Sequence, residues 1–226
     1  MSRPLRLGAV ALAFVITIGG CASRGTPAPA SGDVPIVTRA EWGARDPVLP
    51  MREHRIERIT IHHTATRHDT TRSLAAKLRG LQSFSQRDDS LGDGRKKPAW
   101  ADVPYHYYIA VDGSVGEARS WRYVGDSNTP YDPTGHLLIV VEGNFEDEQL
   151  TEPQRRSLES LVLTFARRFG VPGARLGAHK DYASTRCPGR NLYAELPRLR
   201  ELIDRSRVSL GRDRREDLAQ LELQSP

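Results

Sequence analysis

Cysteine is scarce in this chain, whose 226 residues include only Cys21 and Cys187. Two cysteines cannot build the disulfide framework that stabilises many small secreted domains. A chain of this length with 38% hydrophobic residues can bury one sizeable core without such a framework, and it leaves little room for a second full domain. We therefore predict one main domain held together by apolar packing.

Strong charge of one sign is also lacking. The formal net charge of +5 falls to +3 without Arg3 and Arg6 of the N-terminal segment, since 31 basic residues then face 28 acidic ones. The basic residues are scattered and are not interleaved with aromatic residues, which make up 7% of the chain. This pattern argues against nucleic-acid binding, whereas an anionic cell-wall polymer would suit a weakly basic protein.

The N-terminal apolar run, Leu7 to Ile18, is too short to span a bilayer as a helix. It follows two arginines and precedes small residues, which predicts a secretory signal. An A-x-A cleavage site is missing. Residues 18–21, Ile-Gly-Gly-Cys, instead resemble a bacterial lipobox, in which the chain is cut before a cysteine that is then lipidated. The alternative is an ordinary signal whose cysteine is incidental.

A lipidated Cys21 would anchor the protein to a membrane, because each buried methylene of an acyl chain contributes about 0.8 kcal/mol. The next residue is Ala22, and the aspartate that would argue for inner-membrane retention is absent. We therefore expect an outer-membrane lipoprotein that faces the periplasm. Cys187 would then be an unpaired thiol in an oxidising compartment, and metal ligation is one explanation for its presence.

Composition divides the chain into four parts. We predict a lipoprotein signal peptide at residues 1–20, a proline-rich flexible tether at 21–35, the folded domain at 36–205 and a charged tail at 206–226.

Strand patterns alternate with helix patterns along the predicted domain. Residues 85–99 are polar and rich in turn residues, which predicts an exposed loop. The alternation predicts a single mixed α/β domain with a central mixed β-sheet flanked by helices. The predicted strands cover residues 59–66, 105–111, 136–141 and 175–179, and the predicted helices cover 71–86, the stretch from a capping box at Thr151 to Gly170, and 192–206.

Two adjacent histidines end the run Ile-Thr-Ile-His-His at residues 59–63. Successive side chains of a strand point to opposite faces, so Ile59, Ile61 and His63 share one face. The isoleucine row is the predicted packed face and the threonine row the predicted open one. This parity favours His62 for chemistry and leaves His63 in a supporting role.

A second informative stretch, residues 177–190, contains His179 and Cys187. Thiolate and imidazole are ligands that zinc favours, and His62, His179 and Cys187 together would leave one coordination position open for water. The alternative is a buried cysteine with two unrelated histidines. The remaining histidines are expected at the surface or beside a substrate; they are His54, His68, His106 and His136.

Five ordered motifs resemble the zinc-dependent N-acetylmuramoyl-L-alanine amidase family, which includes peptidoglycan recognition proteins and an amidase-type phage lysozyme. The motifs are TRAEWGARDP (38–47), ITIHHTAT (59–66), WADVPYHYYIAVDGSVGEARSW (100–121), VVEGNF (140–145) and HKDYASTRCPG (179–189). The resemblance implies that His62, His179 and Cys187 hold Zn²⁺.

The same resemblance implies catalytic positions beside the metal. Tyr105 matches a tyrosine beside the metal, and Thr185 matches a position that supports the developing oxyanion. The central-strand glutamate of many bacterial members appears here as Val140, which leaves Glu142, two residues on and on the same strand face, as the candidate proton shuttle.

The activity implied by the resemblance is hydrolysis of the amide between N-acetylmuramic acid and L-alanine, in peptidoglycan or in muropeptides, by a monomer. Two alternatives stay open. One is a non-catalytic peptidoglycan-binding module, although such members often lack the cysteine ligand, and the other is a zinc endopeptidase that cuts within the stem peptide.

Overall fold

The computed structural model describes residues 34–91 and 94–208. The predicted signal peptide, nearly all of the predicted tether and tail residues 209–226 lie outside these residues. Within the described part, no helix is long and apolar enough to cross a membrane.

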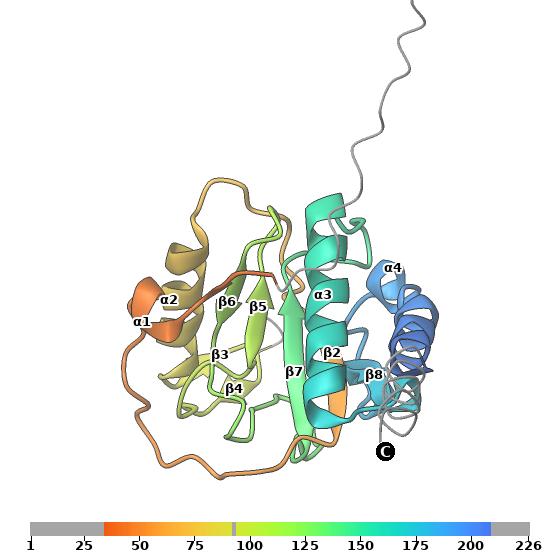
Figure 1. Ribbon diagram of the computed structural model, residues 1–226. Coiled ribbons are helices and arrows are strands. Elements are labelled where there is room, and N and C mark those ends of the chain that lie inside the picture. Colours follow the sequence, from red (N-terminus) through yellow and green to blue (C-terminus); the bar gives the residue numbers. More distant parts are fainter. Residues whose placement is uncertain (1–33, 92–93, 209–226) are drawn as a thin grey trace, which may run out of the picture. The chain divides into compact units, whose positions relative to one another are not determined.

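One mixed β-sheet forms the centre of the described domain, as predicted (Figure 1). Its strand order is β1-β6-β5-β7-β2-β8, and every pairing is parallel except that of β5 with β6. This antiparallel pair is a hairpin that turns at Asp112-Gly113, where Gly113 has a φ of +82°. The strands are β1 (Ile36–Val37), β2 (Arg58–His63), β5 (Tyr107–Ile109), β6 (Val115–Glu117), β7 (His136–Val141) and β8 (Leu176–Ala178).

Helices cover both faces of this sheet. Helix α3 begins at the predicted capping box of Thr151 and ends at Gly170, whose φ of +67° suits glycine. Helix α2 begins at Leu74, after the N-cap residue Ser73 and three residues later than predicted. The predicted helix 192–206 is interrupted by a turn at residues 194–195 and continues over 196–208. The labelled helices are α1 (Arg39–Trp42), α2 (Leu74–Ser85), α3 (Glu152–Phe169) and α4 (Arg190–Tyr193).

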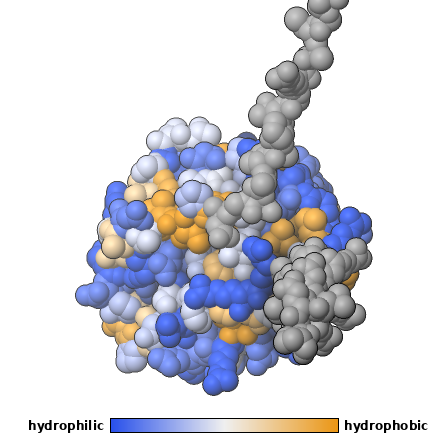
Figure 2. Space-filling view, viewed as in Figure 1, coloured by the Kyte–Doolittle hydropathy of each residue, from blue (hydrophilic) through white to orange (hydrophobic). Residues whose placement is uncertain are grey.

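Two apolar cores lie on opposite faces of the sheet. Ile59 and Ile61 of β2 belong to the core that contains Leu161 and Phe165 of α3. The second core contains Trp42 of α1 and Leu78 of α2 together with the facing side chains of β5 and β7. Seen from the same side as Figure 1, the surface is largely hydrophilic with separate hydrophobic patches (Figure 2).

The threonine face of β2 is closed, which corrects the predicted open row. Thr60 is fully buried, and its hydroxyl lies 2.8 Å from Nδ1 of His136. The prediction failed because β2 lies inside the sheet, between β7 and β8, where both faces of a strand are covered.

The predicted exposed loop at residues 85–99 contains a short antiparallel pair, β3 (Asp89–Ser90) with β4 (Lys96–Lys97). Lys97 is buried, and its ammonium group lies 4.5 Å from the centre of the Trp100 ring. The same group donates hydrogen bonds of 2.8–3.0 Å to the carbonyl oxygens of Ser85, Arg87 and Pro98. The base of this segment is therefore fixed by a buried cation.

Candidate metal centre

Three side chains from separate parts of the chain converge at one end of the sheet. The possible ligand atoms of His62, His179 and Cys187 all lie within 4.8 Å of one another. His62 lies near the end of β2 and His179 directly follows β8, and these two strands pair in parallel with Ile61 beside Ala178. The carboxyl ends of parallel strands lie at the same end of a sheet, so this pairing brings the two histidines together.

Cys187 completes the group from a loop. Its Sγ lies 3.7 Å from Nδ1 of His62 and accepts a hydrogen bond from the backbone N–H of His63 at 3.4 Å. Burial raises the pKa of the Cys187 thiol to about 12, although the His63 N–H opposes the shift. A thiol in this position needs a cation beside it to ionise, because burial disfavours the bare thiolate.

The two histidines are neutral at ordinary pH. Burial lowers the pKa of His62 well below its usual value, and the neighbouring His179 lowers it further. Burial also lowers the pKa of His179 to about 4. Neutral imidazoles each keep a lone pair, which is the form that binds metal ions.

The donor set fits zinc. Bond lengths of about 2.0–2.1 Å to nitrogen and 2.3 Å to sulfur place two ligands of a tetrahedral zinc roughly 3.5 Å apart. The 3.7 Å between Cys187 Sγ and His62 Nδ1 is close to that spacing. Two nitrogen ligands and one sulfur ligand would leave a fourth position for water or substrate.

A groove of about 740 Å³ opens over this centre. His179 and Cys187 line it, while His62 is almost fully buried. The groove has charged walls, to which Arg95, Arg186, Arg190, Glu146 and Asp147 contribute.

Tyr105 and Thr185 both line this groove. The Tyr105 ring lies 5.1 Å from the His62 ring, between centroids, and burial raises the pKa of Tyr105, so its hydroxyl stays protonated. The Thr185 oxygen accepts a hydrogen bond from the Cys187 backbone N–H at 3.2 Å, which leaves the Thr185 proton available to a ligand. The structure therefore brings both residues to the candidate site.

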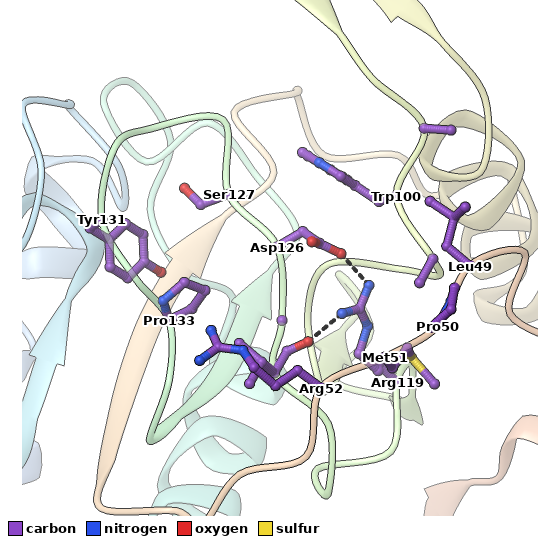
Figure 3. A pocket seen from close by; sticks show the side chains of 14 residues that line it. Leu49, Pro50, Met51, Arg52, Trp100, Arg119, Asp126, Ser127, Tyr131 and Pro133 are labelled. Carbon is purple, nitrogen blue, oxygen red and sulfur yellow. Dashed lines mark hydrogen bonds and ion pairs between the residues drawn. The ribbon is translucent and has the colours of Figure 1, made fainter.

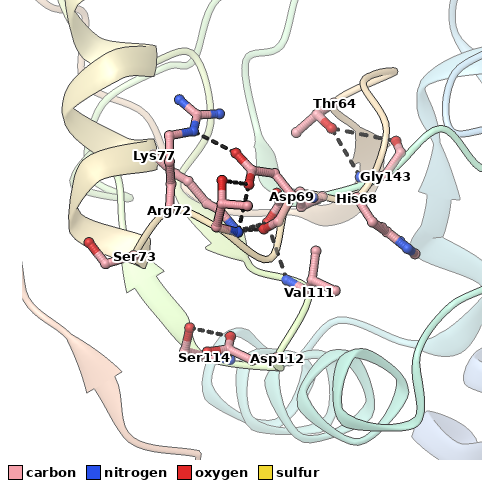
Figure 4. A network of polar contacts seen from close by, with 12 residues as sticks. Thr64, His68, Asp69, Arg72, Ser73, Lys77, Val111, Asp112, Ser114 and Gly143 are labelled. Carbon is pink, nitrogen blue, oxygen red and sulfur yellow. Dashed lines mark hydrogen bonds and ion pairs between the residues drawn. The ribbon is translucent and has the colours of Figure 1, made fainter.

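Glu142 is not brought to this site, which corrects its predicted role as proton shuttle. Its side chain is buried, and Oε2 lies 2.8 Å from the Lys77 ammonium group in an ion pair. The backbone N–H groups of Asp69 and Val111 also donate to this carboxylate, at 3.3 and 3.2 Å. Figure 4 shows Lys77, Asp69 and Val111 around this network, and Glu142 does not line the groove. Its position beyond the end of β7 turns it toward α2.

Two other histidine predictions are wrong. His106 and His136 were expected at the surface or beside a substrate, yet both are buried. His106 bridges two backbone groups, since Nδ1 accepts from the N–H of Leu138 at 2.8 Å and Nε2 lies 2.9 Å from the carbonyl oxygen of Tyr123. A neutral imidazole can satisfy one donor and one acceptor at once, which explains a histidine in the core.

Sequence reasoning missed the residues that contact the two imidazoles from behind. Thr129 Oγ1 lies 2.6 Å from Nε2 of His179, and the Tyr131 hydroxyl lies 3.5 Å from Nε2 of His62. They belong to residues 126–134, Asp-Ser-Asn-Thr-Pro-Tyr-Asp-Pro-Thr, which show turn residues and no periodicity. A pattern of turn residues marks a loop without saying what the loop contacts.

A second cavity of about 380 Å³ lies along the same segment, with Ser127 and Tyr131 in its wall (Figure 3). Trp100 and Arg52 line it as well. The buried Arg119 holds this wall, because its guanidinium group donates to Asp126 and to the carbonyl oxygen of Val124.

The chain thus forms a mixed α/β domain. A cluster of two histidines and one cysteine at one end of its sheet makes a candidate zinc centre under a polar groove. The chain belongs to the N-acetylmuramoyl-L-alanine amidase family, whose family model matches residues 52–190. The predicted family and fold are confirmed.

Individual relatives agree with this membership. The chain is 31% identical over 166 residues to peptidoglycan-recognition protein SC2 of Drosophila simulans, which covers 72% of this chain and 85% of the relative. An N-acetylmuramoyl-L-alanine amidase from Clostridium intestinale is similar in structure, with a TM-score of 0.56, 26% identity and coverage of 72% of this chain and 94% of that one. Peptidoglycan recognition protein LE, solved with tracheal cytotoxin, a monomeric diaminopimelic acid-type peptidoglycan, has a TM-score of 0.59, 27% identity and coverage of 71% and 91%.

Proposed function

We propose that this protein is a zinc-dependent amidase that hydrolyses the bond between N-acetylmuramic acid and L-alanine in peptidoglycan or its fragments. The observation that carries the proposal is the convergence of His62, His179 and Cys187 within 4.8 Å at the groove that also holds Tyr105 and Thr185. Family membership supports a peptidoglycan ligand or amidase activity, and the full ligand set favours the enzyme over a binding module.

The residues of this chain have separate roles in the proposed reaction. His62, His179 and Cys187 would hold the zinc ion, which when bound lowers the pKa of water to about 7 and polarises a carbonyl group. Tyr105 keeps its proton, and its hydroxyl can donate to the carbonyl oxygen as negative charge develops there. Thr185 supplies a second such donor, because its own oxygen is fixed by the Cys187 N–H.

Proton delivery to the leaving amine falls to groups that reach the groove. Glu142 is excluded by its ion pair with Lys77. Tyr105 stays a candidate because it lines the groove beside the ligands.

The groove walls support a peptidic substrate with charged groups. Arg95, Arg186 and Arg190 lie along the groove together with Glu146 and Asp147. Arginine side chains bind carboxylates through planar, paired hydrogen bonds, and the stem peptide of peptidoglycan carries carboxylates.

We also propose that the mature protein acts as a monomer at the outer membrane, facing the periplasm and anchored through lipidated Cys21. The lipobox-like residues 18–21 support this. Growth with labelled palmitate would label the protein, and the Cys21→Ala variant would stay unlabelled. Labelling that survives this substitution would refute the anchor.

Digestion of purified sacculi tests the enzyme proposal directly. The zinc-loaded protein should release intact stem peptides, identified by mass spectrometry, and a chelator should stop the release. Shortened peptides would instead indicate an endopeptidase. Binding to sacculi without soluble products would indicate a non-catalytic module and would overturn the proposal.

A further inference from the structure

Three hydroxyl groups from one loop reach the candidate metal ligands. They belong to Ser127, Thr129 and Tyr131, which alternate along the segment that connects β6 to β7. Thr129 Oγ1 lies 2.6 Å from Nε2 of His179 and 2.7 Å from the Ser127 hydroxyl. Ser127 Oγ is itself 3.5 Å from the same His179 nitrogen.

The His62 ring is contacted from both of its nitrogen atoms. Nδ1 faces the Cys187 sulfur at 3.7 Å, whereas Nε2 faces the Tyr131 hydroxyl at 3.5 Å. The Tyr131 ring also packs against the His179 ring, with centroids 5.1 Å apart. One loop therefore contacts both imidazoles at Nε2.

A ligating histidine binds its metal through one nitrogen and donates an N–H from the other to a partner that fixes the ring. We propose that Thr129 and Tyr131 are positioning residues that hold His179 and His62 as Nε2–H tautomers, so that both rings present Nδ1 to zinc. Ser127 orients the Thr129 hydroxyl. The inference rests on the proposed zinc site, and it is independent of which bond the protein cuts.

Hydroxyl groups differ from the more usual partners of metal-bound histidines. Metal-bound histidines often donate to a carboxylate, which adds negative charge beside the metal. A hydroxyl fixes the tautomer without that charge. Support by hydroxyl groups would add no such charge to that of the Cys187 thiolate, so zinc would keep more of its ability to polarise a carbonyl oxygen.

The opposite arrangement makes a different prediction. If Nε2 of His179 were the zinc ligand, the Thr129 hydroxyl would compete with the metal for that nitrogen. Removing the hydroxyl would then leave zinc binding unchanged or make it tighter.

Metal affinity of the full-length chain separates the two arrangements. We expect Thr129→Val to weaken zinc binding about tenfold or more, measured by competition with a chromophoric chelator. Thr129→Ser keeps the hydroxyl and should restore affinity. Tyr131→Phe should weaken zinc binding less, by a few-fold, because the Tyr131 hydroxyl lies farther from its imidazole nitrogen. With Co²⁺ as the probe, both hydroxyl-free variants should shift the visible absorption bands.

Thr134→Val is the matched control, because the Thr134 hydroxyl lies in the same loop but donates to Asp132 at 2.7 Å. It should leave zinc affinity and the Co²⁺ spectrum unchanged. The inference would be overturned if Thr129→Val bound zinc as tightly as the wild type or more tightly. If the valine variant does not fold, unaltered zinc binding and an unaltered Co²⁺ spectrum in Tyr131→Phe would overturn it. A wild-type chain that binds no zinc overturns both this inference and the proposed function, whereas one that binds zinc without releasing stem peptides overturns the amidase alone.

Discussion

Two buried polar clusters lie near the carboxyl ends of β2 and β7, and they differ in how their groups are satisfied. In the cluster of Lys77 and Glu142, one carboxylate meets an ammonium group and two backbone N–H donors. In the cluster of His62, His179 and Cys187, two nitrogen atoms and one sulfur atom that can bind a metal lie within 4.8 Å of one another. Donors and acceptors balance in the first cluster, which marks it as structural, whereas the second brings together atoms that can ligate a cation.

The largest effect is expected from removing a proposed ligand. Cys187→Ala should lose bound zinc and amidase activity together, because two imidazoles hold zinc much more weakly than three ligands do. Zinc content by mass spectrometry and peptide release from sacculi measure the two losses. Full activity in a chain that contains no metal would break the comparison.

The Lys77–Glu142 cluster should respond in the opposite way, with lost stability and retained chemistry. Lys77→Met leaves a buried carboxylate without its ion-pair partner, which costs about 3–5 kcal/mol of unfolding free energy. Denaturant unfolding measures the loss, and a Lys77→Met/Glu142→Leu double variant should regain part of it. Zinc binding and turnover per folded molecule should stay near wild type, and a large loss of turnover would return Glu142 to the reaction.

Tyr105→Phe tests a group beside the proposed ligands that is not itself a ligand. Zinc content should be unchanged, while kcat should fall about 100-fold through loss of one donor to the carbonyl oxygen. Tyr193→Phe is the control, since its hydroxyl donates to Asp181 at 2.7 Å and Tyr193 does not line the groove. Loss of zinc from Tyr105→Phe would show that the ring supports the metal centre instead.

The smallest effect concerns pH and a buried histidine outside both clusters. Burial lowers the pKa of His106 to about 3, below its usual 6.5. The unfolded chain therefore binds more protons between these values, so the stability from His106 is complete above about pH 6.5 and is lost as pH falls toward 3. The slope is at most about 1.4 kcal/mol per pH unit for this group. In a His106→Gln variant, the free energy of unfolding, measured with denaturant, should fall less between pH 7 and pH 5 than in the wild type. An unchanged fall would contradict the role of His106 in this pH dependence.

Much of the fold could be predicted because local signals agreed with tertiary structure. Thr151 and Gly170 bound α3, as the capping box and the left-handed glycine predict. The alternation in β2 placed His62 and His63 on opposite faces, and the structure brings His62 into the candidate ligand group. These features depend on a few neighbouring residues, so one sequence is enough to find them.

The failures share a different cause, since each depends on partners distant in the chain. Strand parity placed Glu142 on the same face as Val140. It could not show that Lys77, distant in the chain, contacts the carboxylate there. His136 was expected at the surface or beside a substrate, but it is buried, with its Nδ1 2.8 Å from the Thr60 hydroxyl. Thr129 and Tyr131 lie in a loop without periodicity, and their contacts with the imidazoles appear only in three dimensions.

The adjacent histidines make the register of β2 decisive. Moving this strand by one residue against β7 would turn His63 toward Cys187 and would place Thr60, in exchange for Ile59 and Ile61, against the core of α3. The misaligned chain would still offer an imidazole, so histidine chemistry alone does not guard against the error. Burial of the Ile59 and Ile61 side chains does favour the correct register, so apolar packing determines which histidine reaches the centre.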